Sequence, residues 1–227
     1  MDIILQILRR DGYEQPSYLQ RFEICVPRTA TVARAIAELN ARQPLIDING
    51  KTTHPVAWNC GCQQKTCGVC AMVINGKPML ACAAFIEDLT SSQKTISIEP
   101  LSKFPVIRDL VVDTSLLEEK MLEAQAFISG PPEVDVVRDS KLMEVSRCML
   151  CGCCYEVCPN CLPNGPFVGP AAMHGALRAA WQEPTESRRK HIQDTIQKKG
   201  KRHCSRVLSC QVVCPVNISI TRTLTNS

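Results

Sequence analysis

The stretch CMLCGCCYEVCP, residues 148–159, predicts the kind of fold that surrounds it. Its cysteines follow the pattern Cys-x2-Cys-x2-Cys-x3-Cys-Pro, at Cys148, Cys151, Cys154 and Cys158. This is the bacterial two-cluster pattern of iron–sulfur centres, in which the fourth cysteine serves the other cluster. Three more cysteines follow downstream, at Cys204, Cys210 and Cys214. The spacing therefore predicts two iron–sulfur centres in the second half of the chain.

These seven cysteines divide between the two centres by their spacing. The first three can turn around one cubane, and the fourth, about one helical turn further on, points to the other. If the last cysteine of each run serves the cluster of the other run, the [4Fe–4S] cluster is bound by Cys148, Cys151, Cys154 and Cys214. The other site keeps Cys158, Cys204 and Cys210. Because Val207 stands where a fourth cysteine is expected, we predict a [3Fe–4S] cluster there. Cys161 remains open as a fourth ligand of this site, and Cys153 is interpreted as a spare thiol.

A second group of cysteines lies in the first half of the chain. Cys62-x4-Cys67-x2-Cys70, closed by Cys82, matches the plant-type pattern for a [2Fe–2S] cluster. Gly68 can take the tight turn that such a loop needs. Cys60 competes with Cys62, but it would leave six residues instead of four before Cys67, so we leave it out. Cys25, in an expected strand, is interpreted as a small buried hydrophobic residue.

Two other uses of cysteine compete with clusters. A disulfide framework needs an oxidising compartment, but the count of 15 is odd and residues 1–10 do not resemble a signal peptide. Structural zinc prefers two separated pairs of thiols, which does not explain four cysteines in eleven residues ending in Cys-Pro. A zinc-stabilised interaction module is nevertheless the main alternative hypothesis outside redox chemistry. Iron and acid-labile sulfide analysis would distinguish it from a cluster protein.

Charge and hydropathy limit the partners. The net charge of +4 is concentrated in residues 188–190 and 198–202. We interpret these basic residues as a solvated helix face and loop, with attraction to anionic lipid headgroups as the alternative. Only 4% of the residues are aromatic, so few rings are present to stack on bases, and nucleic acid is not expected as a partner. No run of eighteen apolar residues occurs, so no membrane span is expected.

Local patterns predict an α+β protein with two domains. Residues 1–113 should form a β-grasp [2Fe–2S] ferredoxin domain, with strands at 2–9, 22–26 and 94–98 and a helix at about 31–42. Asn75-Gly76 predicts a hairpin between strands 71–74 and 78–82. Residues 114–227 should form an all-α, two-cluster ferredoxin-like domain. Its helices are expected from 114, from 140, at 171–182 and at 186–198, the first one burying Leu116, Leu117, Met121, Leu122 and Ala126.

Four stretches resemble the iron–sulfur subunit of succinate dehydrogenases and fumarate reductases. They are residues 67–78 around the first cysteine loop, 104–113 between the halves, 148–154, and 167–172. The resemblance implies an oxidoreductase complex in which a FAD-containing flavoprotein acts on succinate or fumarate. A membrane anchor with cytochrome b and haem b would bind quinone, and this chain would relay electrons between the two. No G-x-G-x-x-G motif and no nucleophile–base pair is recognisable, so we expect the flavin and the catalytic residues on another chain.

The resemblance also orders the clusters and places the quinone. The [2Fe–2S] cluster would lie nearest the flavin, and the [3Fe–4S] cluster nearest the quinone, beside Pro159, Ser205 and Val207. His203 is adjacent and could carry protons, since the pKa of histidine lies near neutrality. It could equally be a solvent-facing member of the basic segment.

The quinone type is predicted from departures from the family pattern. Ubiquinone-reducing relatives generally carry a tryptophan after the Cys158-Pro159 pair and a histidine after the next cluster cysteine. Here Pro163 and Ser205 stand near those positions. The substitutions favour menaquinone and a menaquinol:fumarate reductase on the cytoplasmic face of a bacterial inner membrane. Succinate oxidation is the alternative direction. Another is a thiol-linked fumarate or heterodisulfide-type reductase, although the Cys-Cys-Gly modules common in that class are not present up to Ser227.

Overall fold

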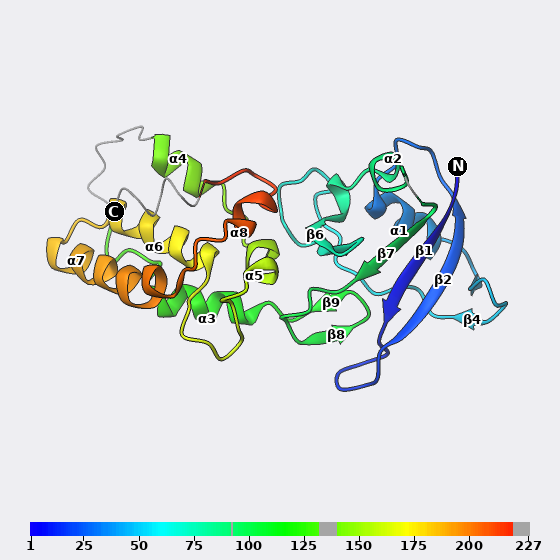
Figure 1. The fold of residues 1–227 in the computed structure, drawn as a ribbon, viewed down its shortest axis with the longest axis horizontal. Helices are drawn as coiled ribbons and strands as arrows, with labels where there is room; N and C mark the ends of the chain where they lie inside the picture. Colours follow the sequence, from blue (N-terminus) through cyan, green and yellow to red (C-terminus); the bar gives the residue numbers. More distant parts are fainter. Residues whose placement is uncertain (92, 132–139, 220–227) are drawn as a thin grey trace. The chain divides into compact units, whose positions relative to one another are not determined.

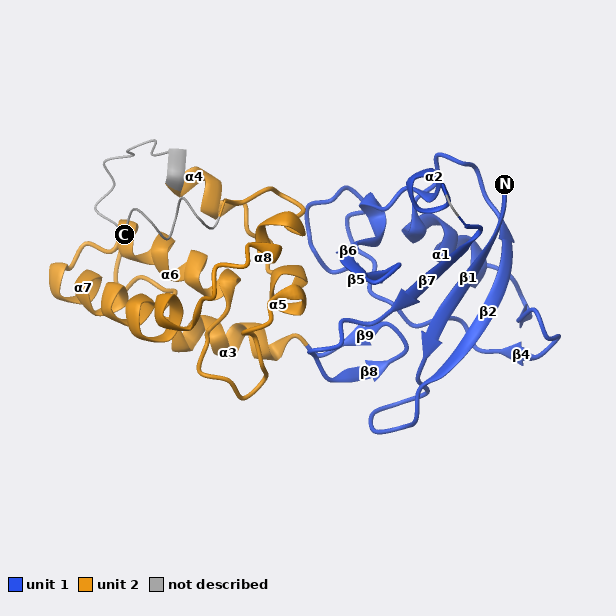
Figure 2. Cartoon of the chain, viewed as in Figure 1, with its two compact units in different colours: residues 1–113 blue, residues 114–227 orange. Residues whose placement is uncertain are grey.

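A five-stranded sheet organises the first of two units, residues 1–113 and 114–227, into which the chain divides (Figures 1 and 2). The structure is a computed structural model that describes residues 1–91, 93–131 and 140–219. The sheet has the order β2-β1-β7-β5-β6. Its strands are β1 (Asp2–Arg9), β2 (Tyr18–Cys25), β5 (Ala71–Ile74), β6 (Lys77–Leu80) and β7 (Thr95–Glu99). The central β1–β7 pair is parallel and the other pairs are antiparallel.

One face of this sheet forms the core together with α1 (Val32–Asn40). Strand alternation buries Ile3, Leu5 and Ile7 of β1. The apolar stripe of α1 is buried as well, at Val32, Ala35, Ile36 and Leu39. The Thr31 hydroxyl caps the helix by accepting a hydrogen bond from the amide of Arg34 at 3.3 Å. A parallel pair crossed over by a helix, with hairpins on both sides, is the β-grasp arrangement that the sequence predicts.

Short elements complete the first unit. They are β3 (Leu45–Ile46), β4 (Thr52–Thr53), the 3-10 turn Ala81–Ala83, α2 (Ile86–Leu89), β8 (Val106–Arg108) and β9 (Val111–Val112). The predicted hairpin turn forms at Asn75 and Gly76, whose φ angles are 46° and 75°. Strand β6 ends at Leu80, so Cys82 lies in the 3-10 turn and not in the strand predicted at 78–82.

Two expectations for β2 were wrong. The strand begins at Tyr18, four residues before the predicted start, and Cys25 is exposed. Strand alternation explains the exposed thiol, because Phe22 and Ile24 face the core and Cys25 therefore faces outward.

The described residues of the second unit form helices joined by loops, without a strand among them. Its helices are α3 (Ser115–Glu123), α4 (Ser140–Ser146), α5 (Cys153–Val157), α6 (Pro170–Gln182), α7 (Glu186–Thr195) and α8 (Ser209–Val212). A π-helical turn, Ile196–Gly200, and a 3-10 turn, Lys201–His203, continue α7. The α7 helix thus ends at Thr195, three residues before the predicted end. In the part of the chain that the structure describes, no helix is long and apolar enough to cross a membrane.

Helix α6 is the centre of this unit and packs against α3, α4, α5 and α7. Its small residues make close approach possible: a Cβ at Gly175 would lie 2.8 Å from Met121 Sδ and 3.0 Å from Ala126 Cβ. On α3, Leu117 is buried as predicted, but Leu122 is 64% exposed. Lys120 is buried instead, because its ammonium contacts Glu123 Oε1 at 3.0 Å and the Gly165 carbonyl at 3.3 Å.

Candidate metal centres

The first cysteine loop is curled by residues in the left-handed region. Gln63, Lys65 and Gly68 have φ angles of 53°, 60° and 77°. This curvature directs the amides of Gln64 and Thr66 at Cys62 Sγ, at 3.3 and 3.4 Å. Together with the Thr66 side chain, the largest contributor, they lower the pKa of Cys62 to about 6. The loop therefore favours the thiolate, which is the form of cysteine that binds metal.

The other three predicted ligands of this centre are held by the same loop and the adjacent hairpin. Cys67 Sγ accepts a hydrogen bond from the Cys62 amide at 3.5 Å. Cys70 directly precedes β5, and its carbonyl accepts from the Ala81 amide at 3.0 Å, which brings the Cys82 turn beside it. Burial and the neighbouring Cys82 raise the pKa of Cys70 to about 12. A cationic metal centre would offset the effects of burial and of Cys82 on the pKa of Cys70, because a thiol that coordinates a metal is deprotonated. The donor set thus fits a thiolate-bound metal cluster.

Cys60 is placed differently from these four. It is exposed, and its Sγ accepts a hydrogen bond from Gln63 Nε2 at 3.3 Å. Between Cys60 and Cys62, a Cβ at Gly61 would lie 3.1 Å from Cys67 Sγ and 3.3 Å from Val69 Cγ2. Gly61 therefore gives the loop room to pass close to Cys67, a requirement that the sequence reasoning missed.

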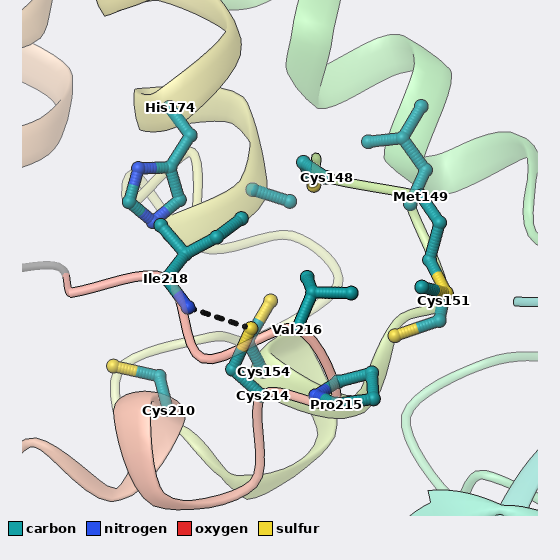
Figure 3. A pocket seen from close by; sticks show the side chains of 12 residues that line it. Cys148, Met149, Cys151, Cys154, His174, Cys210, Cys214, Pro215, Val216 and Ile218 are labelled. Carbon is teal, nitrogen blue, oxygen red and sulfur yellow. Dashed lines mark hydrogen bonds between the residues drawn. The ribbon is translucent and has the colours of Figure 1, made fainter. Parts of the chain in front are cut away.

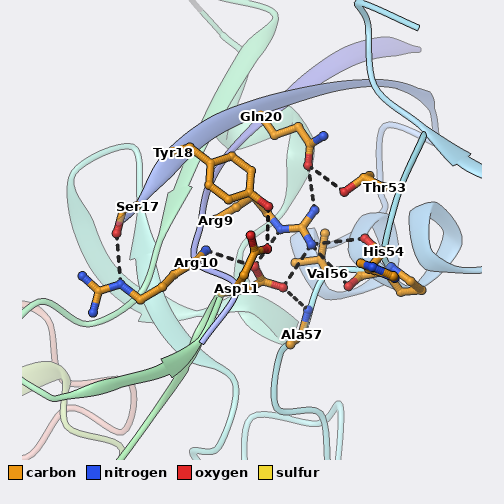
Figure 4. A network of polar contacts seen from close by, with 12 residues as sticks. Arg9, Arg10, Asp11, Ser17, Tyr18, Gln20, Thr53, His54, Val56 and Ala57 are labelled. Carbon is orange, nitrogen blue, oxygen red and sulfur yellow. Dashed lines mark hydrogen bonds and ion pairs between the residues drawn. The ribbon is translucent and has the colours of Figure 1, made fainter. Parts of the chain in front are cut away.

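A buried ion pair anchors the chain just before this loop (Figure 4). Arg9 at the end of β1 and Asp109 are each 1% exposed. Arg9 Nε and Nη2 donate to the two carboxylate oxygens of Asp109 at 2.8 and 3.1 Å. Arg9 Nη1 donates to Gln20 Oε1 at 2.8 Å, and Nη2 also reaches the His54 carbonyl at 3.1 Å. Such planar, bidentate pairing suits an arginine that is removed from water.

The same carboxylate fastens two loops to the sheet. Asp109 accepts hydrogen bonds from the amides of Arg10 at 3.1 Å and Ala57 at 2.8 Å. The Leu110 amide in turn donates to the Ala57 carbonyl at 3.1 Å. Ala57 lies five residues before Cys62, so this network, here called the Arg9–Asp109 clamp, fixes where the cysteine loop begins. The sequence analysis did not find the clamp.

The second unit contains a cavity beside α5 and α6 (Figure 3). Its wall includes Cys148, Cys151, Cys154 and Cys214, the four thiols predicted to act together. Cys210 and His174 line it as well. Burial raises the pKa of Cys148 and of Cys154. The pKa of Cys151 falls to about 7, because the Cys153 thiol and amide donate hydrogen bonds to its sulfur.

The lining of a second cavity includes Cys158, Cys204 and Cys210. Cys210 lines both cavities, and burial beside Cys158 raises its pKa to about 11. Three of the four predicted quinone-proximal residues also line the second cavity, namely Pro159, Ser205 and Val207. The Ser205 hydroxyl and Asn160 Oδ1, 2.6 Å apart, join the two chain segments that form the wall. His203, the fourth, is half-buried and is not among the lining residues.

Two buried cysteines are outside both sets of lining residues. Cys153 and Cys161 are each 0% exposed. The Cys153 thiol donates to the sulfur of Cys151. Cys161 Sγ lies 3.4 Å from where a Cβ at Gly169 would be, next to the Tyr155 ring. The structure thus places neither thiol on the cavity walls that the predicted ligands form.

Five cysteines line the first cavity and three line the second, with Cys210 in both, and the four predicted [2Fe–2S] ligands lie in the first unit. Within the described ranges, no three His, Cys, Asp or Glu side chains are positioned to hold a single metal ion, and the second unit's thiols surround cavities instead. Soft thiolate donors without carboxylates suit iron–sulfur clusters, which cysteine thiolates hold at several irons. The residues present therefore fit the predicted clusters in their chemistry.

Comparison with known proteins agrees with this donor chemistry. Residues 4–119 match a family described as a 2Fe-2S iron-sulfur cluster binding domain, and residues 144–218 match a 4Fe-4S dicluster domain. A succinate dehydrogenase iron-sulfur subunit from Bacillus subtilis is 33% identical over 96% of this chain and 88% of its own length. A fumarate reductase iron-sulfur subunit from Haemophilus influenzae is 33% identical over 75% of this chain and 73% of its own length.

A solved structure shares the whole fold. A chain of the Mycobacterium smegmatis Sdh1 complex in the apo form superposes with a TM-score of 0.78 at 25% identity, covering 98% of this chain and 91% of the other. The sequence-based fold class is confirmed: a [2Fe–2S] ferredoxin domain is followed by a helical dicluster domain. The chain belongs to the family of iron–sulfur subunits of succinate dehydrogenases and fumarate reductases, and is thus an oxidoreductase component.

Proposed function

We propose that this chain relays electrons between a FAD-containing flavoprotein that converts succinate and fumarate and a quinone in the membrane. The observation that carries the proposal is that eleven cysteines gather around one loop and two cavities, in two domains that match cluster-binding families. Bound clusters would supply one-electron redox chemistry. The dicarboxylate chemistry would belong to the flavoprotein.

The proposed ligands follow the three groups. Cys62, Cys67, Cys70 and Cys82 hold the [2Fe–2S] cluster. Cys148, Cys151, Cys154 and Cys214 hold the [4Fe–4S] cluster, and Cys158, Cys204 and Cys210 hold the [3Fe–4S] cluster. The position of Cys210 supports two adjacent centres in the second unit, since a thiol that lines both cavities lies between them. Neighbouring centres are what a relay requires.

A three-iron centre in the second cavity is supported by two residues. Val207, which stands in the sequence where a fourth cysteine is expected, lines the cavity, and its side chain is apolar and 61% exposed. Cys161 is the only alternative ligand that the sequence offered, and it packs against Tyr155 and Gly169 instead of lining the cavity. Three thiolates are therefore available to that cluster among the described residues.

The protein's own role is to set the environment of each centre. In the first loop, backbone amides donate to the Cys62 sulfur, which disperses negative charge. In the second unit, the Ile218 amide donates to Cys214 Sγ at 3.4 Å. Burial favours the less charged state of a centre, whereas donors favour the more negative one. Together these contributions set the potentials that decide the direction of electron flow.

The quinone is proposed to bind beside the second cavity. Val207 and Val212 are 61% and 85% exposed, and Leu208 is exposed too. Apolar side chains left in water near a cluster suit contact with an integral anchor, here a cytochrome b subunit with haem b. The chain would then be a peripheral protein on the cytoplasmic face of a bacterial inner membrane. Ser205 and the Pro163 region favour menaquinone, and hence menaquinol:fumarate reduction, because menaquinone has the lower potential.

Succinate oxidation is the second candidate direction. It is favoured by the relative from Bacillus subtilis, which matches over 96% of this chain and is named a succinate dehydrogenase subunit. The fumarate reductase relative from Haemophilus influenzae matches over 75% of the chain.

The test supplies the purified complex with menaquinol and ubiquinol analogues under identical conditions and measures fumarate reduction and succinate oxidation. We expect turnover with the menaquinone couple, and we expect fumarate reduction to be faster than succinate oxidation. Turnover with the ubiquinone couple alone would contradict the menaquinone assignment. A complex that lacks activity in both directions and contains no iron would contradict the relay itself.

A further inference from the structure

A buried histidine lines the cavity proposed for the [4Fe–4S] cluster. His174 lies on α6 and is 5% exposed. Its Nδ1 is fully buried and has no hydrogen-bonding partner among the described residues. Figure 3 shows the imidazole above Ile218, at one side of the space that the cysteines surround.

A buried polar ring needs a partner, and none of the described residues supplies one to Nδ1. Ile218 beside it is apolar and 2% exposed. The charged groups that act on this region come from two helices: Glu144 of α4 acts on His174, and Arg178 of α6 acts on Cys148. The Glu144 carboxylate is already engaged by the Ser219 amide at 2.6 Å. The other ring nitrogen, Nε2, is not among the fully buried unpaired atoms, and the ring lines the cavity that the cysteines surround.

The chemistry of that occupant matches the ring. A neutral imidazole carries one donor and one acceptor. An unpaired N–H in a protein interior is rarer than an unpaired acceptor, so the proton belongs on Nε2 and not on the unpartnered Nδ1. The ring then offers one N–H, and the sulfur atoms of an iron–sulfur cluster accept hydrogen bonds.

We propose that His174 donates a hydrogen bond to the cluster held by Cys148, Cys151, Cys154 and Cys214, and thereby raises its reduction potential. The inference rests on the proposed function. Reduction adds one electron to the centre and makes its sulfur atoms better acceptors. A fixed N–H donor therefore stabilises the reduced form more than the oxidised form. Without this donor, the centre should be harder to reduce.

The first experiment compares midpoint potentials in the assembled complex, measured by EPR-monitored redox titration of the [4Fe–4S] cluster. In His174→Leu we expect a tenfold smaller equilibrium constant for reduction, which is about 59 mV for one electron. His174→Gln retains an N–H donor and should recover most of the shift. His191→Leu, at an exposed histidine on α7, is the matched control and should leave the potential unchanged.

The second experiment detects the hydrogen bond itself. Pulsed EPR of the reduced wild-type complex with ¹⁵N-labelled histidine should show a nitrogen coupling to the [4Fe–4S] signal, absent from His174→Leu. The labelled wild type alone decides the question if that variant does not assemble. No coupling in the wild type, or equal shifts in His174→Leu and His174→Gln, would overturn the role of His174. Absence of any [4Fe–4S] signal from the wild type would instead overturn the proposed function, and this inference with it.

Discussion

Pairs of left-handed residues recur in the three cysteine loops. Gln63 and Lys65 form one pair, Leu150 and Gly152 the second, and Arg206 and Leu208 the third, with φ angles between 53° and 82°. In each pair one residue of ordinary φ stands between them. Alternation of left- and right-handed residues turns successive amides toward one side and creates a concavity for an anion, as in many iron–sulfur sites. Most of these residues are not glycine, so each loop accepts unfavourable backbone conformations at its site.

At Val207, a single change should alter the number of irons. Val207→Cys adds a thiol to the wall of the second cavity, between two left-handed residues. We expect it to convert the [3Fe–4S] cluster to [4Fe–4S], so that the EPR signal of the oxidised complex disappears and a new signal develops on reduction.

Cys161→Ser is the control for Val207→Cys and should keep the [3Fe–4S] signal, since Cys161 does not line this cavity. If Cys161→Ser removes the signal and Val207→Cys has no effect, the ligand assignment is wrong.

The Arg9–Asp109 clamp should be costly to break. Asp109→Asn keeps a residue that tolerates the φ angle of 46°, but it leaves the Arg9 charge buried and unpaired. We expect a loss of about 3–5 kcal/mol in the free energy of unfolding, measured as a lower midpoint of denaturant unfolding. Glu38→Gln breaks the exposed Arg34–Glu38 pair and should cost less than about 1 kcal/mol. Equal losses in the two variants would contradict the clamp.

Residue-level prediction from sequence rested on local spacing and missed partners that lie far apart in the chain. The cysteine groups were predictable because turns of a few residues fix which thiols can meet. Arg9 and Asp109 are separated by 100 residues and carry no shared local signal. His174 looked like one of four scattered histidines, because only the fold shows that α6 turns it toward the cysteines.

Helix α6 begins at a glycine that no other residue can replace without strain. Gly169 has φ 89° and ψ 163°, a region that is essentially restricted to glycine. A Cβ there would also lie 2.9 Å from Tyr155 Cδ2. The start of α6, and with it His174, thus depends on contact with α5.

Gly169→Ala should therefore destabilise the second unit by about 2–5 kcal/mol, adding backbone strain to overpacking. Gly50→Ala is a useful control, because Gly50 also has a positive φ of 80° but no atom lies within 4 Å of the added Cβ. It should cost only about 1–2 kcal/mol. Thermal unfolding followed by circular dichroism measures both, and a Gly169→Ala loss no larger than the control's would contradict the close packing.

The stability that Glu183 contributes, directly after α6, should be lost in acid. Hydrogen bonds from Ser129 Oγ, the Ser129 amide and the Thr185 amide hold the pKa of Glu183 below its ordinary value. A lowered folded-state pKa contributes stability above the unfolded pKa, about 4.3, and this contribution is lost as the pH falls. Glu183→Gln should therefore lose less stability than the wild type between about pH 5 and pH 3.5, in unfolding titrations. Glu186→Gln, with a side chain 81% exposed, should follow the wild type. Parallel pH curves for Glu183→Gln and the wild type would contradict this role.

The predicted boundary of a strand was wrong where a polar residue faces the protein interior. Strand β2 was predicted at residues 22–26, but it begins at Tyr18. Gln20 is 5% exposed and serves the Arg9–Asp109 clamp, whereas Leu19 is 60% exposed. The tertiary network thus reverses the local pattern. Likewise α7 ends early in a π-helical turn, where Gly200 packs against Met173, and no periodicity in that segment predicts such packing.

At the scale of the whole molecule, each unit carries its own cysteine groups. All four proposed [2Fe–2S] ligands lie within residues 1–113, and the other seven lie within 114–227. The proposed ligands of each cluster therefore all come from one compact unit. The Asn75-Gly76 turn, the helix pattern and the two cysteine motifs made this division predictable, because they are all local signals.

The most direct test of the three-cluster relay is quantitative EPR of the purified complex, combined with iron and acid-labile sulfide analysis. The account predicts about nine irons and ten sulfides per chain. It also predicts a [3Fe–4S] signal in the oxidised complex, and [2Fe–2S] and [4Fe–4S] signals on reduction. Succinate should generate the [2Fe–2S] signal through the flavoprotein. A colourless, zinc-loaded protein without these signals would contradict it.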